Sequence, residues 1–98
     1  MMSTAVASLD DNKGGGNYAY RTSKTALNMV MKNLSIELKD AGILVMAMHP
    51  GWVQTEMGGP NALISVEECC SNMVKTLESL KEENQDCFKR YDNTDIPW

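Results

Sequence analysis

A continuous apolar run, Ile43-Leu44-Val45-Met46-Ala47-Met48, constrains the fold of this chain more than any other feature. The run has the length of a β-strand and does not alternate with polar residues, which is typical of a strand buried on both faces in a parallel sheet. It ends at His49-Pro50-Gly51, where proline cannot donate a ladder hydrogen bond and glycine lets the backbone turn. Such a strand needs neighbouring strands and helices over both faces, so the sequence predicts an α/β fold.

A helix is predicted before this strand, over residues 18–40, because apolar residues recur there at spacings of three and four. The stripe that we expect to face the core consists of Leu27, Val30, Met31, Leu34 and Leu38. Met29 and Ile36 lie on the opposite side, which indicates that the helix is also covered from outside. Asn17 is the expected N-cap of this helix and Gly42 its expected stop.

A second helix is predicted after the strand. Ser65-Val66-Glu67-Glu68 has the pattern of a capping box, in which Ser65 is the N-cap and Glu68 reaches back. Its expected buried stripe consists of Met73, Val74, Leu77 and Leu80. A last short strand is predicted over residues 87–91. At the other end of the chain, residues 2–9 suggest the tail of a strand, and residues 10–17, with three glycines, suggest a loop.

Composition excludes several classes of function. The chain has 98 residues, enough for at most one small domain, and a formal net charge of −4. The acidic balance argues against nucleic acid as a partner, and the chain has neither a polybasic segment nor an apolar run of membrane-spanning length. Three cysteines make no disulfide framework, so we expect a cytoplasmic protein. Cys69 and Cys70 could form a redox pair or bind a metal, but we favour two partly buried helix residues, and we expect no metal site.

The pair Tyr20 and Lys24 carries the strongest chemical signal. The two residues are four apart on the predicted helix, which places a phenol beside an ammonium on the same face. A neighbouring ammonium lowers the pKa of a phenol and lets it act as a proton donor near neutral pH. Alone this spacing is weak, because tyrosine and lysine often stand at such a distance without a role.

The surrounding residues make the signal specific. The chain resembles the short-chain dehydrogenase/reductase family, and within it the C-factor and sniffer-type carbonyl reductases, in the segments Tyr18-Ala19-Tyr20-Arg21-Thr22-Ser23-Lys24-Thr25-Ala26-Leu27-Asn28 and His49-Pro50-Gly51-Trp52-Val53. The resemblance covers nearly the whole chain but only the C-terminal half of that family's domain. It therefore implies a partial domain over residues 1–98, the C-terminal part of a doubly wound, Rossmann-like parallel sheet.

The resemblance also implies roles for individual residues. Tyr20 would transfer the proton in a carbonyl reduction, and Lys24 would support it and hold the nicotinamide ribose of NADP or NAD. The turn after the buried strand would contact the nicotinamide through Pro50, Gly51, Val53 and Thr55. The family's substrate-binding serine corresponds here to Thr4, with Ser3 and Ser8 as alternatives.

Two hypotheses of function follow from the resemblance. In the first, the chain is the catalytic half of an NAD(P)-dependent carbonyl reductase that acts on a small-molecule substrate. The first strand, the glycine-rich turn and the helix that bind a dinucleotide in this family have no counterpart in these residues, so we expect the 98 residues alone to be inactive. In the second, the chain is inactive and pairs with a relative or a second copy through the Tyr18–Asp40 helix.

Overall fold

The computed structural model describes all 98 residues and contains two α-helices and two β-strands. The helices are α1 (Tyr18–Glu37) and α2 (Val66–Glu78), and the strands are β1 (Ala47–His49) and β2 (Phe88–Arg90). Single turns of 3-10 helix are formed by Ala5–Ala7, Lys39–Ala41 and Glu82–Asn84. The α/β class predicted from the sequence is confirmed.

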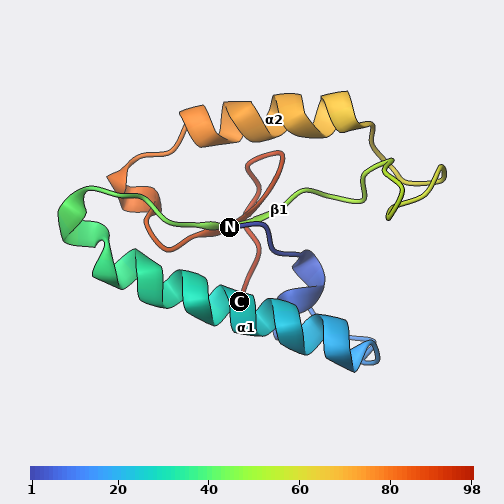
Figure 1. Ribbon diagram of the computed structural model, residues 1–98, viewed down its shortest axis with the longest axis horizontal. Coiled ribbons are helices and arrows are strands. Elements are labelled where there is room, and N and C mark those ends of the chain that lie inside the picture. The colour runs from blue at the N-terminus through green and yellow to red at the C-terminus, as the bar shows by residue number, and fades with distance from the viewer.

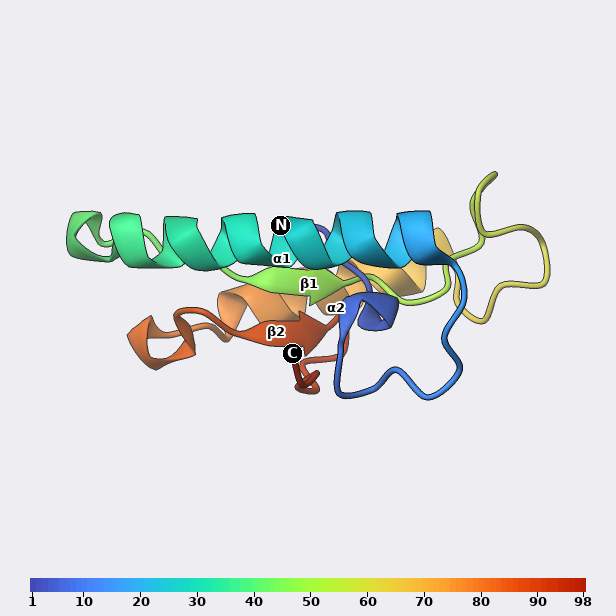
Figure 2. The same cartoon turned by 90° about the horizontal axis from the view of Figure 1, so that it is seen from below.

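The strands form the middle layer of a three-layer arrangement. In Figures 1 and 2, α1 and α2 run along opposite sides of the strands. The strands pair in parallel, with Ala47 opposite Phe88 and His49 opposite Arg90. The first residues of the chain extend this sheet on the other side of β1, because Met2 and Met48 form a parallel bridge. The expected strand tail at residues 2–9 is therefore present, although it passes into the 3-10 turn at Ala5–Ala7.

The buried strand is shorter than predicted. Only Ala47–His49 form β1, whereas Ile43 and Leu44 remain 48% and 40% exposed. The strand is short because the backbone before Ala47 bonds to a side chain: the Val45 amide donates to the Gln85 side chain at 3.0 Å rather than to a neighbouring strand. The amide of Asp86 in turn donates to the Val45 carbonyl, so regular pairing starts only at Ala47.

Helix α1 follows the prediction with three corrections. It begins at Tyr18 as expected but ends at Glu37, and the Lys39–Ala41 turn follows, closed by Gly42 with a φ of 74°. Asn17 precedes the helix in a left-handed conformation, so its side chain makes no capping bond. Val30 is 49% exposed rather than part of the core face, which is formed instead by Asn28, Met31 and Ser35.

On the outer face of α1, the sequence predicted apolar residues that another surface covers. Met29 and Ile36 are 62% and 63% exposed. An apolar face of this kind is available to a second copy of the chain, and the homo-oligomer that we expect through this helix stays a prediction.

Helix α2 begins at the predicted cap but buries a different face. The Ser65 hydroxyl accepts a hydrogen bond from the Glu68 amide at 3.1 Å. The second bond of a capping box, from the Ser65 amide to the Glu68 carboxylate, is not formed. Cys69 and Thr76 face the strands, and the Thr76 hydroxyl donates to the Tyr91 carbonyl at 2.8 Å. Val74 and Leu77, which we expected in the core, are about half exposed. Periodicity finds an apolar stripe correctly, but it does not show which neighbour covers that stripe.

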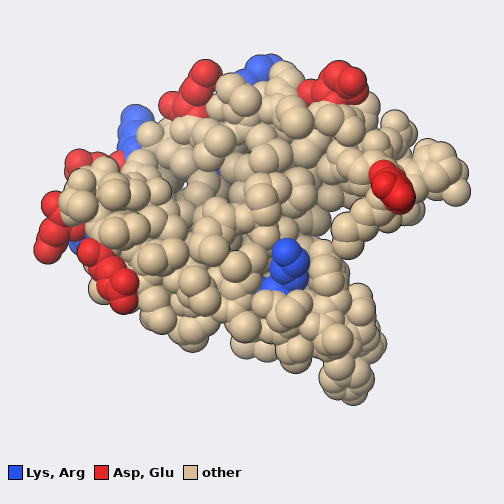
Figure 3. All heavy atoms as spheres, in the orientation of Figure 1, with Lys and Arg blue, Asp and Glu red and all other residues tan.

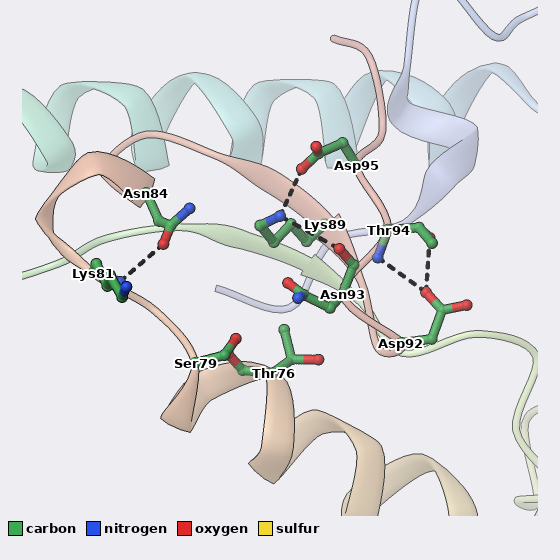
Figure 4. Close-up of polar contacts among 9 residues, drawn as sticks. All are labelled: Thr76, Ser79, Lys81, Asn84, Lys89, Asp92, Asn93, Thr94 and Asp95. Atoms are coloured by element: carbon green, nitrogen blue, oxygen red, sulfur yellow. Dashed lines mark hydrogen bonds and ion pairs between the residues drawn. The ribbon is translucent and has the colours of Figure 1, made fainter.

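The core lies between α1 and the strands and consists of Met31, Ala47, Phe88 and Ile96. Ile96 reaches it because the chain turns back after β2, where Lys89 and Asp95 form an antiparallel bridge. Figure 4 shows the Lys89 ammonium donating to the Asp95 carboxylate, at 2.7 Å. In the same turn the Asp92 carboxylate accepts from the Thr94 hydroxyl and amide, and these hydrogen bonds hold the pKa of Asp92 below its usual value.

Candidate functional site

A cleft of about 780 Å³ opens at the carboxyl end of β1. The first turn of α1, the loop that follows β1 and the first turns of α2 all meet at this end of the molecule, at the right of Figure 1. Open α/β sheets bind their ligands at the carboxyl ends of the strands. Of the sequence-predicted site residues, the cleft brings together Thr4, Tyr20, Pro50, Gly51, Val53 and Thr55, and Ser3, an alternative to Thr4, also lines it.

Thr4 enters the cleft from the extended segment that precedes the first 3-10 turn. Its side-chain oxygen accepts from the Val6 amide at 3.4 Å, which leaves the hydroxyl hydrogen available to another acceptor. Ser3 and Ser8, the alternatives from the sequence, are otherwise engaged. The Ser3 hydroxyl donates to the Asn28 side chain at 2.6 Å, and Ser8 accepts from the Asp11 amide and borders a different cavity. The geometry therefore favours Thr4 among the three.

Tyr20 lies in the first turn of α1 and is half-buried at the cleft wall. Its phenol forms no hydrogen bond within the chain, so the hydroxyl is free to meet a ligand. Lys24 stands one helical turn further on but does not line the cleft. Its ammonium donates to the Met2 carbonyl at 3.4 Å. That contact ties the lysine to the segment that carries Thr4.

Pro50 and Gly51 form the turn that ends β1. Gly51 has a φ of 87°, in the left-handed region that favours glycine. The Pro50 carbonyl accepts from the Cys69 thiol at 3.1 Å, which fixes the turn to α2. The sequence predicted the turn, and the structure adds the partner that holds it.

The segment after this turn exposes a free backbone donor. Val53 pairs with Ile64 in a parallel bridge, in which the neighbouring amide of Gln54 donates to Ile64. The Val53 amide itself makes no hydrogen bond within the chain and stands at the cleft. Thr55 is less free, because its hydroxyl accepts from the Gly58 amide and lies 3.4 Å from the Val53 carbonyl. Of the two predicted carboxamide contacts, Val53 is the better placed donor.

Helix α2 supplies a wall that the sequence analysis did not assign to the site. Cys69, Cys70 and Met73 line the cleft from the first two turns of this helix, together with Val66. Their spacing of three and four residues was the available signal, but we read it as general packing. Burial raises the pKa of the Cys69 thiol, and the adjacent Cys70 raises it further. No group of three or more His, Cys, Asp or Glu side chains could hold a metal ion.

His49 is the only histidine of the chain and also borders the cleft. Burial lowers its pKa from the usual 6.5, and the neighbouring Arg90 guanidinium lowers it further. Its Nδ1 is buried without a hydrogen-bond partner. The imidazole is therefore neutral at pH 7 and adds no charge to the cleft.

Comparison with known proteins identifies the family. Residues 4–63, more than half of the chain, match the family model described as short chain dehydrogenase. The chain belongs to this family. The matched residues include Tyr20, Lys24 and the turn after β1, which carried the resemblance in the sequence, and also Thr4.

Individual relatives agree with the narrower resemblance to the C-factor and sniffer-type carbonyl reductases. The chain is 39% identical over 97 residues to the C-signal protein of Myxococcus xanthus, and the match covers 99% of this chain and 58% of that protein. It superposes on the carbonyl reductase Sniffer of D. melanogaster with a TM-score of 0.94 and 42% identity, covering 99% of this chain and 39% of that one. It also superposes on an NADPH-bound carbonyl reductase from chicken fatty liver, with a TM-score of 0.89 and 33% sequence identity, covering 99% of this chain and 41% of that one.

The similarity to these structures confirms the Rossmann-like fold class predicted from the sequence, with its parallel strands between two helices. The chain spans between two fifths and three fifths of the length of these relatives. Neither helix of the chain is both long and apolar enough to cross a membrane.

Proposed function

We propose that this chain carries the proton-transfer half of a nicotinamide-dependent carbonyl reductase. The observation that supports the proposal best is the meeting of Thr4 and Tyr20 in one cleft with the turn that follows β1. Two hydroxyl groups of different acidity then face a space large enough for a small ligand. The alternative, an inactive chain that acts only through α1, would leave this arrangement without a use.

The chemistry follows from what each group can donate. When a carbonyl is reduced, its oxygen gains negative charge and must receive a proton. The Thr4 hydroxyl can donate a hydrogen bond to that oxygen and orient it, because its own acceptor position is used by the Val6 amide. Tyr20 then supplies the proton, and Lys24, one helical turn further on, carries a positive charge on the same side of the helix.

The residues of the turn fit a nicotinamide. A carboxamide needs a hydrogen-bond donor for its oxygen, and the Val53 amide is free at the cleft. Gly51 keeps the backbone there close to the wall without a side chain. Bound NADP or NAD would supply the hydride. The solved carbonyl reductase that was bound to NADPH supports NADP over NAD.

The lining of the cleft favours an uncharged carbonyl substrate. No Asp, Glu, Lys or Arg lines it, and His49 is its only basic group. Trp52, Met57 and Met73 give the wall an apolar character. Figure 3 shows most atoms of Lys, Arg, Asp and Glu toward the outline of this face, with basic atoms also nearer its middle. A charged substrate would lose its hydration here without gaining an ion pair.

The proposal includes a cytoplasmic location. Cys69, Cys70 and Cys87 are all free thiols, which suits a reducing compartment.

Replacement of Tyr20 by phenylalanine tests the function. The full-length protein encoded by the gene is assayed with an aldehyde or ketone, and oxidation of NADPH or NADH is followed by absorbance. We expect Tyr20→Phe to abolish reduction, a loss of about 100-fold or more, with nicotinamide binding largely retained, because the ring stays and only the proton donor is removed. Tyr18→Phe, on an 80% exposed ring two residues away, is the control and should keep full activity. Turnover by Tyr20→Phe near the wild-type rate would refute the proposed mechanism.

A further inference from the structure

One side of α1 is devoted to holding the segment that carries Thr4. Arg21 and Thr25 contact the carbonyls of Val6 and Ala7, at 3.0 and 2.9 Å. The Lys24 ammonium donates to the Met2 carbonyl. Asn28 completes the row at the next helical position. Residues three and four apart share one helix face, so these four polar side chains form a single polar stripe along the first half of α1.

The contact between Ser3 and Asn28 differs from the others in the stripe. It joins two side chains, at 2.6 Å, and both residues are about 95% buried. A buried polar pair of this kind costs free energy when either partner is lost, and an apolar pair of similar size would pack there at no such risk. The pair is therefore suited to holding the segment around Ser3 in one particular alignment against α1 rather than to adding stability.

This alignment determines the direction in which the Thr4 side chain points. The backbone of Thr4 is extended, with φ −151° and ψ 148°. In an extended segment neighbouring side chains point in opposite directions, so anchoring Ser3 against α1 directs the next side chain away from the helix. The same helix carries Tyr20, two turns before Asn28. The Ser3–Asn28 bond therefore connects the two hydroxyl-bearing segments of the cleft.

We propose that Asn28 and Ser3 are positioning residues, which set the Thr4 hydroxyl opposite Tyr20 for the reaction. This inference rests on the proposed function, in which Thr4 orients the substrate carbonyl. Neither residue needs to touch the substrate. Their effect on the reaction passes through Thr4, and this dependence can be measured.

A double-mutant cycle tests that dependence in the full-length protein. Asn28→Leu keeps the side-chain volume and removes the acceptor, and we expect it to lower kcat about tenfold, because a small misplacement of a catalytic group has effects of this size. In a Thr4→Val background, which keeps the shape but lacks the hydroxyl, the same change should lower kcat less than about twofold. The KM for the nicotinamide should not change. Asn33→Leu, on an exposed asparagine of the same helix, is the matched control.

The outcomes separate the two proposals. An equal loss of kcat from Asn28→Leu in both backgrounds would mean a general structural role and would overturn this inference. Full kcat for Asn28→Leu alongside an inactive Tyr20→Phe protein would refute the inference alone. A Tyr20→Phe protein with normal turnover would refute the proposed function itself. Should Asn28→Leu fail to fold, as judged by circular dichroism, Ser3→Ala removes the same bond with a smaller change in volume.

A second measurement needs no turnover. Three-bond NMR couplings report the χ1 rotamer of Thr4 in the full-length protein. We expect one rotamer in the wild type and in Asn33→Leu, and averaging between rotamers in Ser3→Ala. A fixed Thr4 rotamer in Ser3→Ala would contradict the positioning role.

Discussion

The ring of Tyr91 lies directly against Gly51, so closely that a Cβ at position 51 would stand 2.9 Å from its Cε1 atom. Ile64 closes the same space from another side, at 3.0 Å. The segment after β2 thus packs against the turn after β1. Glycine at this position is required both by the backbone, with its positive φ, and by the lack of room.

Replacement of Gly51 by alanine should therefore destabilise the protein. We expect a loss of about 2–4 kcal/mol in the free energy of unfolding, from backbone strain and from the clash together. Gly42→Ala, which has a positive φ but open space around it, should lose only about 1 kcal/mol. Urea denaturation of the three proteins provides the comparison. Equal losses at both positions would show that the contact with Tyr91 has no cost.

His49 should make the stability of the protein depend on pH. Its pKa is lowered in the folded state, whereas in the unfolded chain it is near 6.5. Below about 6.5 the unfolded chain therefore binds a proton that the folded chain does not, so stability falls as the pH drops from about 7 toward 5. Above pH 7 both states are neutral, and His49 contributes no dependence.

His49→Asn should remove most of this pH dependence. Denaturation at several pH values, with both proteins, measures the difference in slope. Because the chain has one histidine, a single imidazole signal in the NMR spectrum gives its pKa directly. A value above 6.5 would contradict the expected sign.

The three thiols should react at different rates. Cys70 is exposed, whereas Cys69 is 4% exposed and donates to the Pro50 carbonyl. Burial raises the pKa of Cys69 and of Cys87, and only the thiolate is a nucleophile. Iodoacetamide at pH 8, followed by peptide mass spectrometry, should therefore modify Cys70 first. Faster labelling of Cys69 would mean that α2 does not pack as described.

Loss of Lys24 should have a wider effect than loss of Tyr20. Lys24→Ala removes the contact with the Met2 carbonyl and the positive charge beside Tyr20, so we expect both turnover and nicotinamide binding to weaken. The control is Lys39→Ala, an exposed lysine beyond the end of α1. Steady-state kinetics and calorimetry measure the two effects separately. Unchanged nicotinamide binding by Lys24→Ala would exclude a role in holding the cofactor.

Local patterns predicted much of this structure. The start of α1 at Tyr18, the cap at Ser65 and the turn at Pro50-Gly51 were all placed correctly. Each depends on neighbouring residues only: helical periodicity, a hydroxyl that accepts a hydrogen bond from a nearby amide, and a glycine with positive φ. The sequence also named six of the residues that line the cleft, through the family resemblance.

Other features depend on which segments meet. The apolar run from Ile43 forms a strand only from Ala47, because the Val45 amide donates its hydrogen bond to the Gln85 side chain instead of to a strand. Val74 and Leu77 continue an apolar stripe but lie about half exposed, since α2 turns Cys69 and Thr76 toward the strands.

The amino-acid order by itself determined where the two helices begin and where the chain turns after β1, because both follow from interactions within a few residues. The tertiary structure decided that Lys24 contacts the Met2 carbonyl, that Cys69 and Cys70 line the cleft, and that Asn28 holds Ser3. These contacts join residues about 20 or more positions apart. Their energies depend on burial and distance in the folded chain, which no local pattern contains.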